Sequence, residues 1–283
     1  MYSCLGITVF FNEFEMLFLQ LKTLSRVCDH IIIVEAECNA RGELRDKLEF
    51  NQFLERFGDR VRDISYEYLR VPQKEFKAVA DIGRASSIAA EANTGRCRAI
   101  PIINNKAHYY IYNDVDEIFS DEQIEEIKSL ISGNFKGLKT FNFWYHNYYL
   151  NLRCFRLKKW KRIFRYYRPD IGQEPHLFDY ESGQEFALQY KGVRPNTVET
   201  NLKPIGYHFS FLYSLETKLK NYGHTEWTNQ ISIAMQRREN KIPACFPNWK
   251  CKTIPMADIQ VRDLHENIDV FKPFIVPETI GKK

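Results

Sequence analysis

Two aspartates at the end of a predicted strand are the residues of this sequence best placed to do chemistry. Asp114 and Asp116 follow the apolar and aromatic run 107–113, and a helix start comes directly after them. Carboxylates spaced in this way can hold a hard cation such as Mg²⁺ or Mn²⁺, which keeps open positions for phosphate oxygens. A cation held there would neutralise a leaving diphosphate. Position and neighbours must support this interpretation, because Asp-x-Asp arises by chance roughly once in a chain of this length.

The elements that would position these aspartates follow from the pattern of apolar residues. Short apolar runs predict strands at 7–11, 30–35, 61–69, 107–113 and 138–145. Helical spacing predicts helices at 13–25, 46–57, 77–98 and 120–131, with Asn12 capping the first and a capping box at Ser120 opening the last. This alternation predicts an α/β fold, a Rossmann-like and mainly parallel sheet flanked by helices, followed by a less regular C-terminal region.

Three groups of polar residues fall at the predicted carboxyl ends of strands, where such folds bind ligands. They are Asn12 with Glu13, Glu35, and the pair Asp114 and Asp116. At this edge Glu35 is suited to hydrogen bonds with uracil or ribose, and Asn12 and Glu13 are placed to contact a donor. Each group also has a plainer interpretation as a turn, cap or strand-end residue.

Several short motifs occur in a specific order along the chain. They are Phe11-Asn12-Glu13, Ile33-Val34-Glu35, Asn113-Asp-Val-Asp-Glu-Ile118, Gly206-Tyr-His-Phe-Ser210 and His224-Thr-Glu226. This order resembles glycosyltransferase family 17, which includes the bisecting β-1,4-mannosyl-glycoprotein N-acetylglucosaminyltransferases, over roughly residues 5 to 240. Where the family often has a Gly-Lys-Pro turn after the second motif, this chain has Cys38-Asn-Ala-Arg-Gly42.

The resemblance implies a GT-A fold and a metal-dependent, inverting glycosyltransferase that uses Mn²⁺ or Mg²⁺. The donor would be a nucleotide sugar, UDP-N-acetylglucosamine in characterised relatives, and the acceptor a glycan or glycoconjugate. We expect Asp116 to bind the metal directly, and Asp114 to contact the ribose or to reach the metal through water. Glu117 is expected to orient these ligands.

A late histidine commonly completes the metal site of GT-A enzymes, and this chain offers two. His208 lies in the alternating run 206–211, where Tyr207 and Phe209 would face the core and His208 the ligand side. His224 is the rival, at the start of a predicted helix. The plainer interpretation of His208 is a core histidine bonded to backbone.

The remaining catalytic roles are less specific. Arg96 is a candidate for neutralising the diphosphate, although a solvated helix face explains it equally well. Inverting transfer needs one carboxylate beside the acceptor hydroxyl to act as general base. The acceptor-side half offers four candidates, and spacing selects none of them: Glu174, Asp179, Glu181 and Glu185.

The domain organisation predicted from these patterns is one GT-A-like domain over residues 1–242. Within it, residues 1–145 would form the nucleotide-binding half and 146–242 the acceptor half, with 243–283 as an extension that packs on the domain. The polar-aromatic run 145–149 suits stacking against a sugar ring.

Composition narrows the class of protein further. The chain has 283 residues, 44% of them hydrophobic, and its charge of +4 is too small and scattered to indicate a nucleic-acid protein. The basic stretch 153–168 could meet a phosphate or an acidic surface, or form a solvated strand face. Seven cysteines without CxxC spacing, and no signal-peptide or membrane-anchor pattern, predict a cytoplasmic protein of microbial or viral type. The oligomeric state is not indicated.

Two other classes of function compete with glycosyl transfer. A haloacid-type phosphatase also uses Asp-x-Asp after a strand, but its nucleophilic Asp lies near the N-terminus, whereas Asp114 is in mid-chain. A non-catalytic nucleotide-sugar or glycan-binding module could lose the metal pair, and here the pair is intact. A GT-A transferase with another nucleotide sugar remains an alternative to one using UDP-N-acetylglucosamine.

Overall fold

The computed structural model describes most of the N-terminal half of the chain and separate segments of the rest. The described residues are 2–76, 93–95, 97, 100–102, 104–105, 107–132, 139–149, 154–166, 196–199, 206–210 and 251–275. Within 139–149, 154–166, 196–199, 251–253 and at residue 210, only the backbone is described.

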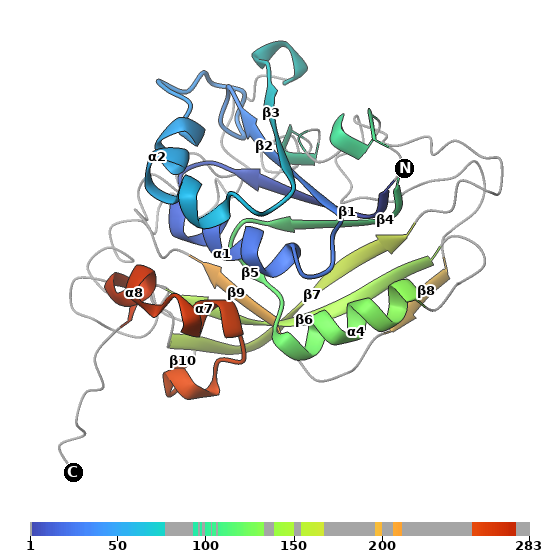
Figure 1. The fold of residues 1–283 in the computed structure, drawn as a ribbon, viewed down its shortest axis with the longest axis vertical. Coiled ribbons are helices and arrows are strands. Elements are labelled where there is room, and N and C mark those ends of the chain that lie inside the picture. Colours follow the sequence, from blue (N-terminus) through green and yellow to red (C-terminus); the bar gives the residue numbers. More distant parts are fainter. Residues whose placement is uncertain are drawn as a thin grey trace.

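Four parallel strands form the N-terminal half of the sheet, in the order β3-β2-β1-β4. They are β1 (Tyr2–Phe10), β2 (His30–Ala36), β3 (Tyr66–Val71) and β4 (Ala107–Asp114). Figure 1 shows these strands side by side, with β1 between β2 and β4. The predicted α/β fold with a parallel sheet in this half is therefore confirmed.

Beyond β4 the sheet becomes mixed. The order continues β4-β7-β6-β9-β5 through β7 (Cys154–Tyr166), β6 (Lys139–Tyr149), β9 (Gly206–Ser210) and β5 (Glu117–Ile118). Two further strands pair with this half, β8 (Asn196–Glu199) with β6 and β10 (Cys251–Thr253) with β7. Residue 145, the predicted boundary between the two halves, lies inside β6.

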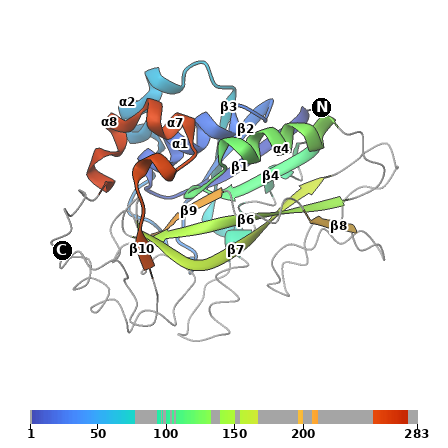
Figure 2. The same ribbon diagram turned by 90° about the horizontal axis from the view of Figure 1, so that it is seen from below.

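The described helices include three longer ones, a short one after β3 and a group of short ones in the C-terminal segment. The longer helices are α1 (Phe14–Leu24), α2 (Phe50–Val61) and α4 (Asp121–Ser132). The short elements are η1 (Gln73–Glu75), η4 (Met256–Asp258), α7 (Arg262–Glu266), α8 (Ile268–Phe271) and η5 (Lys272–Phe274). Figure 2 shows α1, α4, α7 and α8 on the same side of the sheet.

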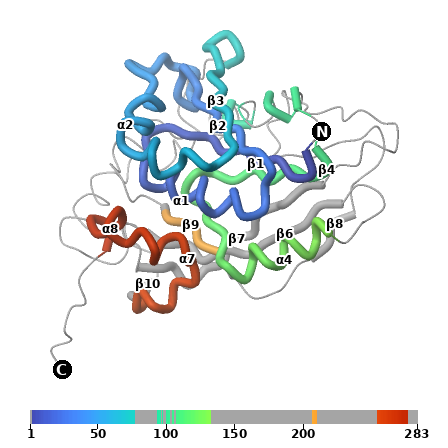
Figure 3. Tube along the Cα trace, viewed as in Figure 1, coloured from blue at the N-terminus to red at the C-terminus, as the bar shows by residue number. Residues whose placement is uncertain are grey.

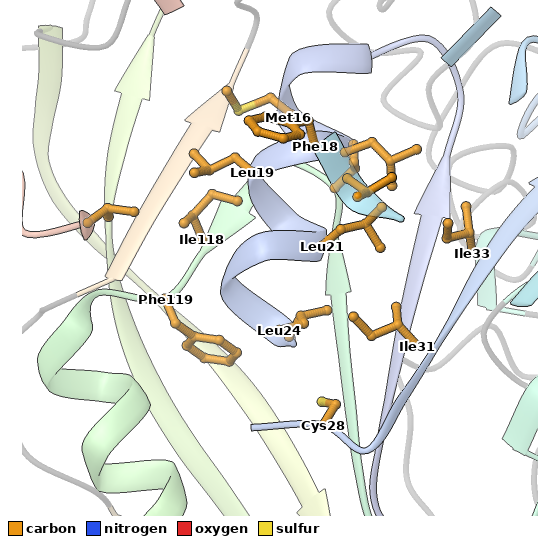
Figure 4. Close-up of a cluster of buried hydrophobic side chains, with 14 of the residues drawn as sticks. Met16, Phe18, Leu19, Leu21, Leu24, Cys28, Ile31, Ile33, Ile118 and Phe119 are labelled. Carbon is orange, nitrogen blue, oxygen red and sulfur yellow. The ribbon is translucent and has the colours of Figure 1, made fainter. Parts of the chain in front are cut away.

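Side chains of the central parallel strands alternate between two buried faces, as expected of a sheet covered on both sides. On one face Phe10, Ile31 and Ile33 pack with the helices in a large aromatic and aliphatic core. Figure 4 shows α1 at the centre of this core, with Phe18, Leu21 and other side chains pointing into it. On the other face Leu5, Ile7, Val9, Ile32 and Val34 pack with residues of the segment before β4, Cys97 and Ile102.

The described part of the C-terminal segment returns to the first helix. Figure 3 traces residues 254–275 back to the side of α1, and Leu264 and Phe271 are buried in the same core. Arg26, at the end of α1, forms ion pairs with Asp121 of α4 and Asp263 of α7. One cation thus links three helices that lie far apart in the sequence.

Two helix starts and two strand starts differ from the sequence prediction. The first strand begins at Tyr2, five residues before the predicted start at 7. The second helix begins at Phe50 rather than at 46 and runs to Val61, so β3 starts at Tyr66 instead of 61. The N-cap position of α1 is Glu13, one residue after the predicted Asn12, and no side chain bonds there. The capping box of α4 is confirmed, since the Ser120 and Gln123 side chains each accept the other residue's backbone N–H.

Candidate active site at the carboxyl edge of the sheet

The register of the parallel strands brings the three predicted groups of polar residues to one edge. Phe10 at the end of β1 lies opposite Glu35 of β2, and Val9 lies opposite Asp114 of β4. Asn12 and Glu13 follow β1 directly and lead into α1. Because β1 is the strand between the other two, the ends of β2 and β4 are roughly 10 Å apart, two strand spacings.

The segment between β4 and β5 is a tight turn that carries both aspartates. The side chain of Asn113 donates a hydrogen bond to the backbone carbonyl of Glu117 at 3.0 Å. The backbone N–H of Asp114 donates to the Glu117 carboxylate at 3.2 Å. Glu117 is buried, and its carboxylate stabilises the turn. The role in orienting metal ligands that was expected of it stays a prediction.

His208 is brought next to Asp116 by pairing between β5 and β9. Glu117 lies opposite His208 in this antiparallel pair, and Phe209 donates its N–H to the Asp116 carbonyl at 2.8 Å. The Nε2 atom of His208 is 3.5 Å from Oδ1 of Asp116. Both side chains are largely enclosed, with 15% and 5% of their surface exposed. A carboxylate and an imidazole from distant parts of the chain therefore face each other.

The alternation of β9 explains why the imidazole points this way. Tyr207 and Phe209 lie on the opposite face, where both are buried in the core and their rings stack with centroids 5.8 Å apart. The Tyr207 hydroxyl accepts the Gln260 backbone N–H at 2.7 Å, so the C-terminal segment holds β9 in place. Burial raises the pKa of this hydroxyl, which keeps it protonated.

The side chains at this edge could serve as ligands of a divalent cation, although they do not supply a complete set of ligands. Carboxylate oxygen and imidazole nitrogen both bind Mn²⁺-type ions, and Asp116 and His208 supply one of each. Among the residues that the structure describes, no three His, Cys, Asp or Glu side chains are grouped as a metal centre of their own. A cation held by Asp116 and His208 would thus leave positions for water and phosphate oxygens, as nucleotide-bound metals require.

Glu35 contacts several other parts of the protein, and the contact with uracil or ribose predicted for it stays a prediction. It is fully buried, and its carboxylate accepts the backbone N–H groups of Glu49 and Phe50 at 2.7 and 3.2 Å. The Tyr68 hydroxyl donates to it at 3.0 Å, and Arg45 lies 3.1 Å away. A uracil or ribose would have to displace these groups. The carboxylate instead anchors the start of α2, which accounts for the helix beginning at Phe50.

Arg45 is a residue of this edge that sequence reasoning missed. Its guanidinium donates to the backbone carbonyls of Phe11 at 2.7 Å and Ala36 at 3.2 Å, and lies over the Phe11 ring. It therefore ties the end of β1 to the end of β2. The sequence offered no signal for this role beyond a basic residue shortly after Glu35, because the contact depends on strand order.

Asn12 and Glu13 lie in the connection between β1 and α1, close to the carbonyl that Arg45 holds. The Asn12 N–H donates to the Glu13 carboxylate at 3.3 Å, and the Glu13 carbonyl accepts the first helical bond, from Leu17. Asn12 is partly exposed at this edge, whereas Glu13 is buried.

The other predicted site residues lie outside the described residues. They are Arg96, the four candidate bases Glu174, Asp179, Glu181 and Glu185, and the rival histidine His224. Their roles stay predictions. Within the described part of the chain, no helix has the length and apolar character needed to cross a membrane.

Comparison with known proteins gives structural similarities only. No protein-family model and no curated protein sequence matches the chain. The S. aureus TarS structure of residues 1–349 is 10% identical, with a TM-score of 0.41, over 84% of this chain and 72% of that one. Another S. aureus TarS structure is 9% identical, with a TM-score of 0.38, over 84% and 44%.

A third similar structure is the mannosyltransferase PcManGT from Pyrobaculum calidifontis, in complex with GDP-Man and Mn²⁺. It is 10% identical, with a TM-score of 0.30, over 50% of this chain and 35% of that one. The chain thus spans less than two thirds of two of these three proteins. These similarities concern the backbone arrangement alone.

Proposed function

We propose that this chain is a metal-dependent, inverting glycosyltransferase that moves a sugar from a nucleotide donor to a hydroxyl of a glycan acceptor. The observation that carries the proposal is the pairing of Asp116 with His208 at the carboxyl edge of a parallel sheet. The order of sequence motifs supports UDP-N-acetylglucosamine as the donor. Another nucleotide sugar is the alternative within the same chemistry.

The roles of the residues follow from their places at this edge. Asp116 and His208 would hold a Mn²⁺ or Mg²⁺ ion, which when bound supplies positive charge to the departing diphosphate. Asp114, which lies at the end of β4 opposite Val9, would contact the ribose or a metal-bound water. Glu117 keeps the turn in shape through its bond to the Asp114 N–H. The enclosed position of Asp116 and His208 limits competition from water.

Inversion requires one displacement, with the acceptor oxygen attacking as the bond to the diphosphate breaks. One carboxylate must take the proton of that hydroxyl, and we propose that it is among Glu174, Asp179, Glu181 and Glu185. When each of the four is converted to its amide in turn, we expect one variant to lose most of its kcat while its donor affinity stays close to wild type. Proton NMR of the product formed from an α-linked donor tests inversion, since a β-linkage is expected.

The direct test of the proposed site is calorimetric titration of UDP, with Mn²⁺ and with a chelator. Asp116→Asn keeps the size of the side chain but removes its charge, so we expect it to abolish the metal-dependent part of UDP binding. Asp63→Asn is the matched control, because Asp63 is an exposed aspartate that follows the end of α2. Equal UDP affinity in wild type and Asp116→Asn, or UDP binding that the chelator leaves unchanged, would refute the proposed site.

A non-catalytic nucleotide-sugar or glycan-binding module is the alternative class of function. It would bind the donor without turning it over. An assay of donor hydrolysis and transfer, with and without Mn²⁺, separates the two, since an enzyme releases UDP and a binding module does not.

A further inference from the structure

The connection between β2 and α2 is a structured loop rather than a loose one. The Asn39 side chain accepts the backbone N–H groups of Arg41 and Glu43, at 2.9 and 3.1 Å, and donates to the Glu43 carboxylate at 2.7 Å. Gly42 takes a φ of 78°, a left-handed conformation that glycine adopts without strain. Asn39 therefore holds Arg41 inside a closed turn.

This turn is also attached to the rest of the fold. The buried Asn93 donates its side-chain N–H to the Ala40 carbonyl at 2.9 Å. On the other side, the Arg45 N–H donates to the Glu37 carbonyl at 2.8 Å, and the Arg45 guanidinium is bound to Phe11 and Glu35. The backbone at Arg41 is thus fixed relative to the ends of β1 and β2.

Arg41 is the exception among the arginines whose side chains the structure describes. Every other one has a carboxylate within 4.0 Å: Arg26, Arg45, Arg56, Arg60, Arg62, Arg70 and Arg262. Arg41 is partly buried, and its Nε atom is enclosed with no hydrogen-bond partner. A guanidinium is always charged and carries donors in a planar fork. An enclosed N–H donor such as this Nε–H costs the fold free energy unless a ligand supplies an acceptor.

We propose that Arg41 is an oxyanion-binding residue that takes a phosphate group of the nucleotide donor. The inference rests on the proposed function for the identity of the ligand, while the enclosed Nε atom without a hydrogen-bond partner is an observation on Arg41 itself. The residue lies in the connection after β2, and the end of β2 is about two strand spacings, roughly 10 Å, from the end of β4 that leads to Asp116. An extended nucleotide donor spans such an edge. Arginine forks match phosphate oxygens with two parallel hydrogen bonds. The phosphates of the donor would then be bound at two places, by the metal at the end of β4 and by the Arg41 guanidinium in the connection between β2 and α2.

The test is calorimetric titration of UDP, uridine and inorganic pyrophosphate into the full chain, with wild type, Arg41→Gln and Arg41→Lys compared. We expect Arg41→Gln to weaken UDP binding at least tenfold and pyrophosphate binding similarly, and to leave uridine binding unchanged. Arg41→Lys should recover part of the loss, because it keeps the charge but not the fork. Arg62→Gln is the control, since Arg62 is exposed and follows α2.

The outcomes separate this inference from the proposed function. UDP binding that needs Mn²⁺ and Asp116 but is within twofold of wild type in Arg41→Gln would refute the role of Arg41 and leave the proposed function standing. A chain that binds no UDP, but whose metal-free pyrophosphate binding is lost in Arg41→Gln, would refute the nucleotide donor and keep the oxyanion site. If Arg41→Gln does not fold, full UDP affinity in Arg41→Lys refutes the fork-dependent contact.

Discussion

The Nε2 atom of His208 lies 3.5 Å from Oδ1 of Asp116, although the two residues are in different halves of the chain. The contact exists because β5 follows the Asp-x-Asp turn within two residues and pairs with β9. The same turn joins the parallel half of the sheet to the mixed half. A metal site at this turn can therefore take its ligands from both halves of the sheet.

The first prediction concerns His208. Replacing His208 with Gln should weaken Mn²⁺ binding at least ~10-fold, since even residues that only orient metal ligands contribute that much. Titration of Mn²⁺ followed by electron paramagnetic resonance measures the free ion directly. His108→Gln is a suitable control, because His108 is a partly exposed histidine near the amino end of β4. Unchanged Mn²⁺ affinity in His208→Gln would assign the role to His224 or to water.

The second prediction separates stability from ligand binding at Glu35. Because the carboxylate is buried and bound by Arg45, Tyr68 and the start of α2, Glu35→Ala should lower the free energy of unfolding by about 3–5 kcal/mol. Urea unfolding followed by circular dichroism measures it, and exposed Glu67→Ala should change it by less than about 0.5 kcal/mol. A fully stable Glu35→Ala protein that no longer binds uridine would instead support the predicted donor contact.

The third prediction concerns a polar side chain inside the core. Gln20 of α1 is fully buried, and neither its side-chain nitrogen nor its oxygen has a hydrogen-bond partner. Gln20→Met has a similar shape and removes the desolvated amide, so it should raise the free energy of unfolding by about 1–3 kcal/mol. Gln52→Met on α2, where the side chain is partly exposed, is the control. Destabilisation by Gln20→Met would show that the amide is satisfied in solution.

The fourth prediction is that two glutamates at the β2–α2 connection give opposite pH dependences. The Gln73 N–H and Arg70 hold the pKa of Glu37 below its ordinary value of 4.5. Its carboxylate therefore contributes stability above pH 4.5, which is lost as the pH falls through the lower folded pKa. Glu37→Gln should be less stable than wild type at pH 7, and the difference should vanish in acid.

Glu49 is expected to behave in the reverse way. Burial raises its pKa above 4.5 despite the nearby Arg45 and Lys47, so the folded state favours the protonated form and stability falls as the pH rises through the folded pKa. Glu49→Gln should be more stable than wild type at pH 7 and equal to it below pH 4.5. Thermal unfolding from pH 3 to 8 tests both residues, and parallel curves for the two variants would contradict the assigned shifts.

The sequence by itself was sufficient to predict the parallel half of the fold and the edge where its polar residues meet. Strand periodicity and β-branched composition are local properties, so β2 and β4 were predicted close to their observed bounds, whereas β1 begins five residues before its predicted start. The capping box at Ser120 is equally local. Alternation along residues 206–211 was enough to place Tyr207 and Phe209 on the core side of β9.

Only the tertiary structure decided which of these residues contact one another. No local pattern shows that Glu35 anchors α2, because the N–H groups it binds come from the next helix. The start of α2 was therefore predicted four residues too early, at 46 rather than 50. The pairing of Asp116 with His208 and the enclosure of the Arg41 Nε atom without a hydrogen-bond partner likewise depend on strand order and loop closure. Long-range contacts of this kind arise from packing, which periodicity along a single chain does not encode.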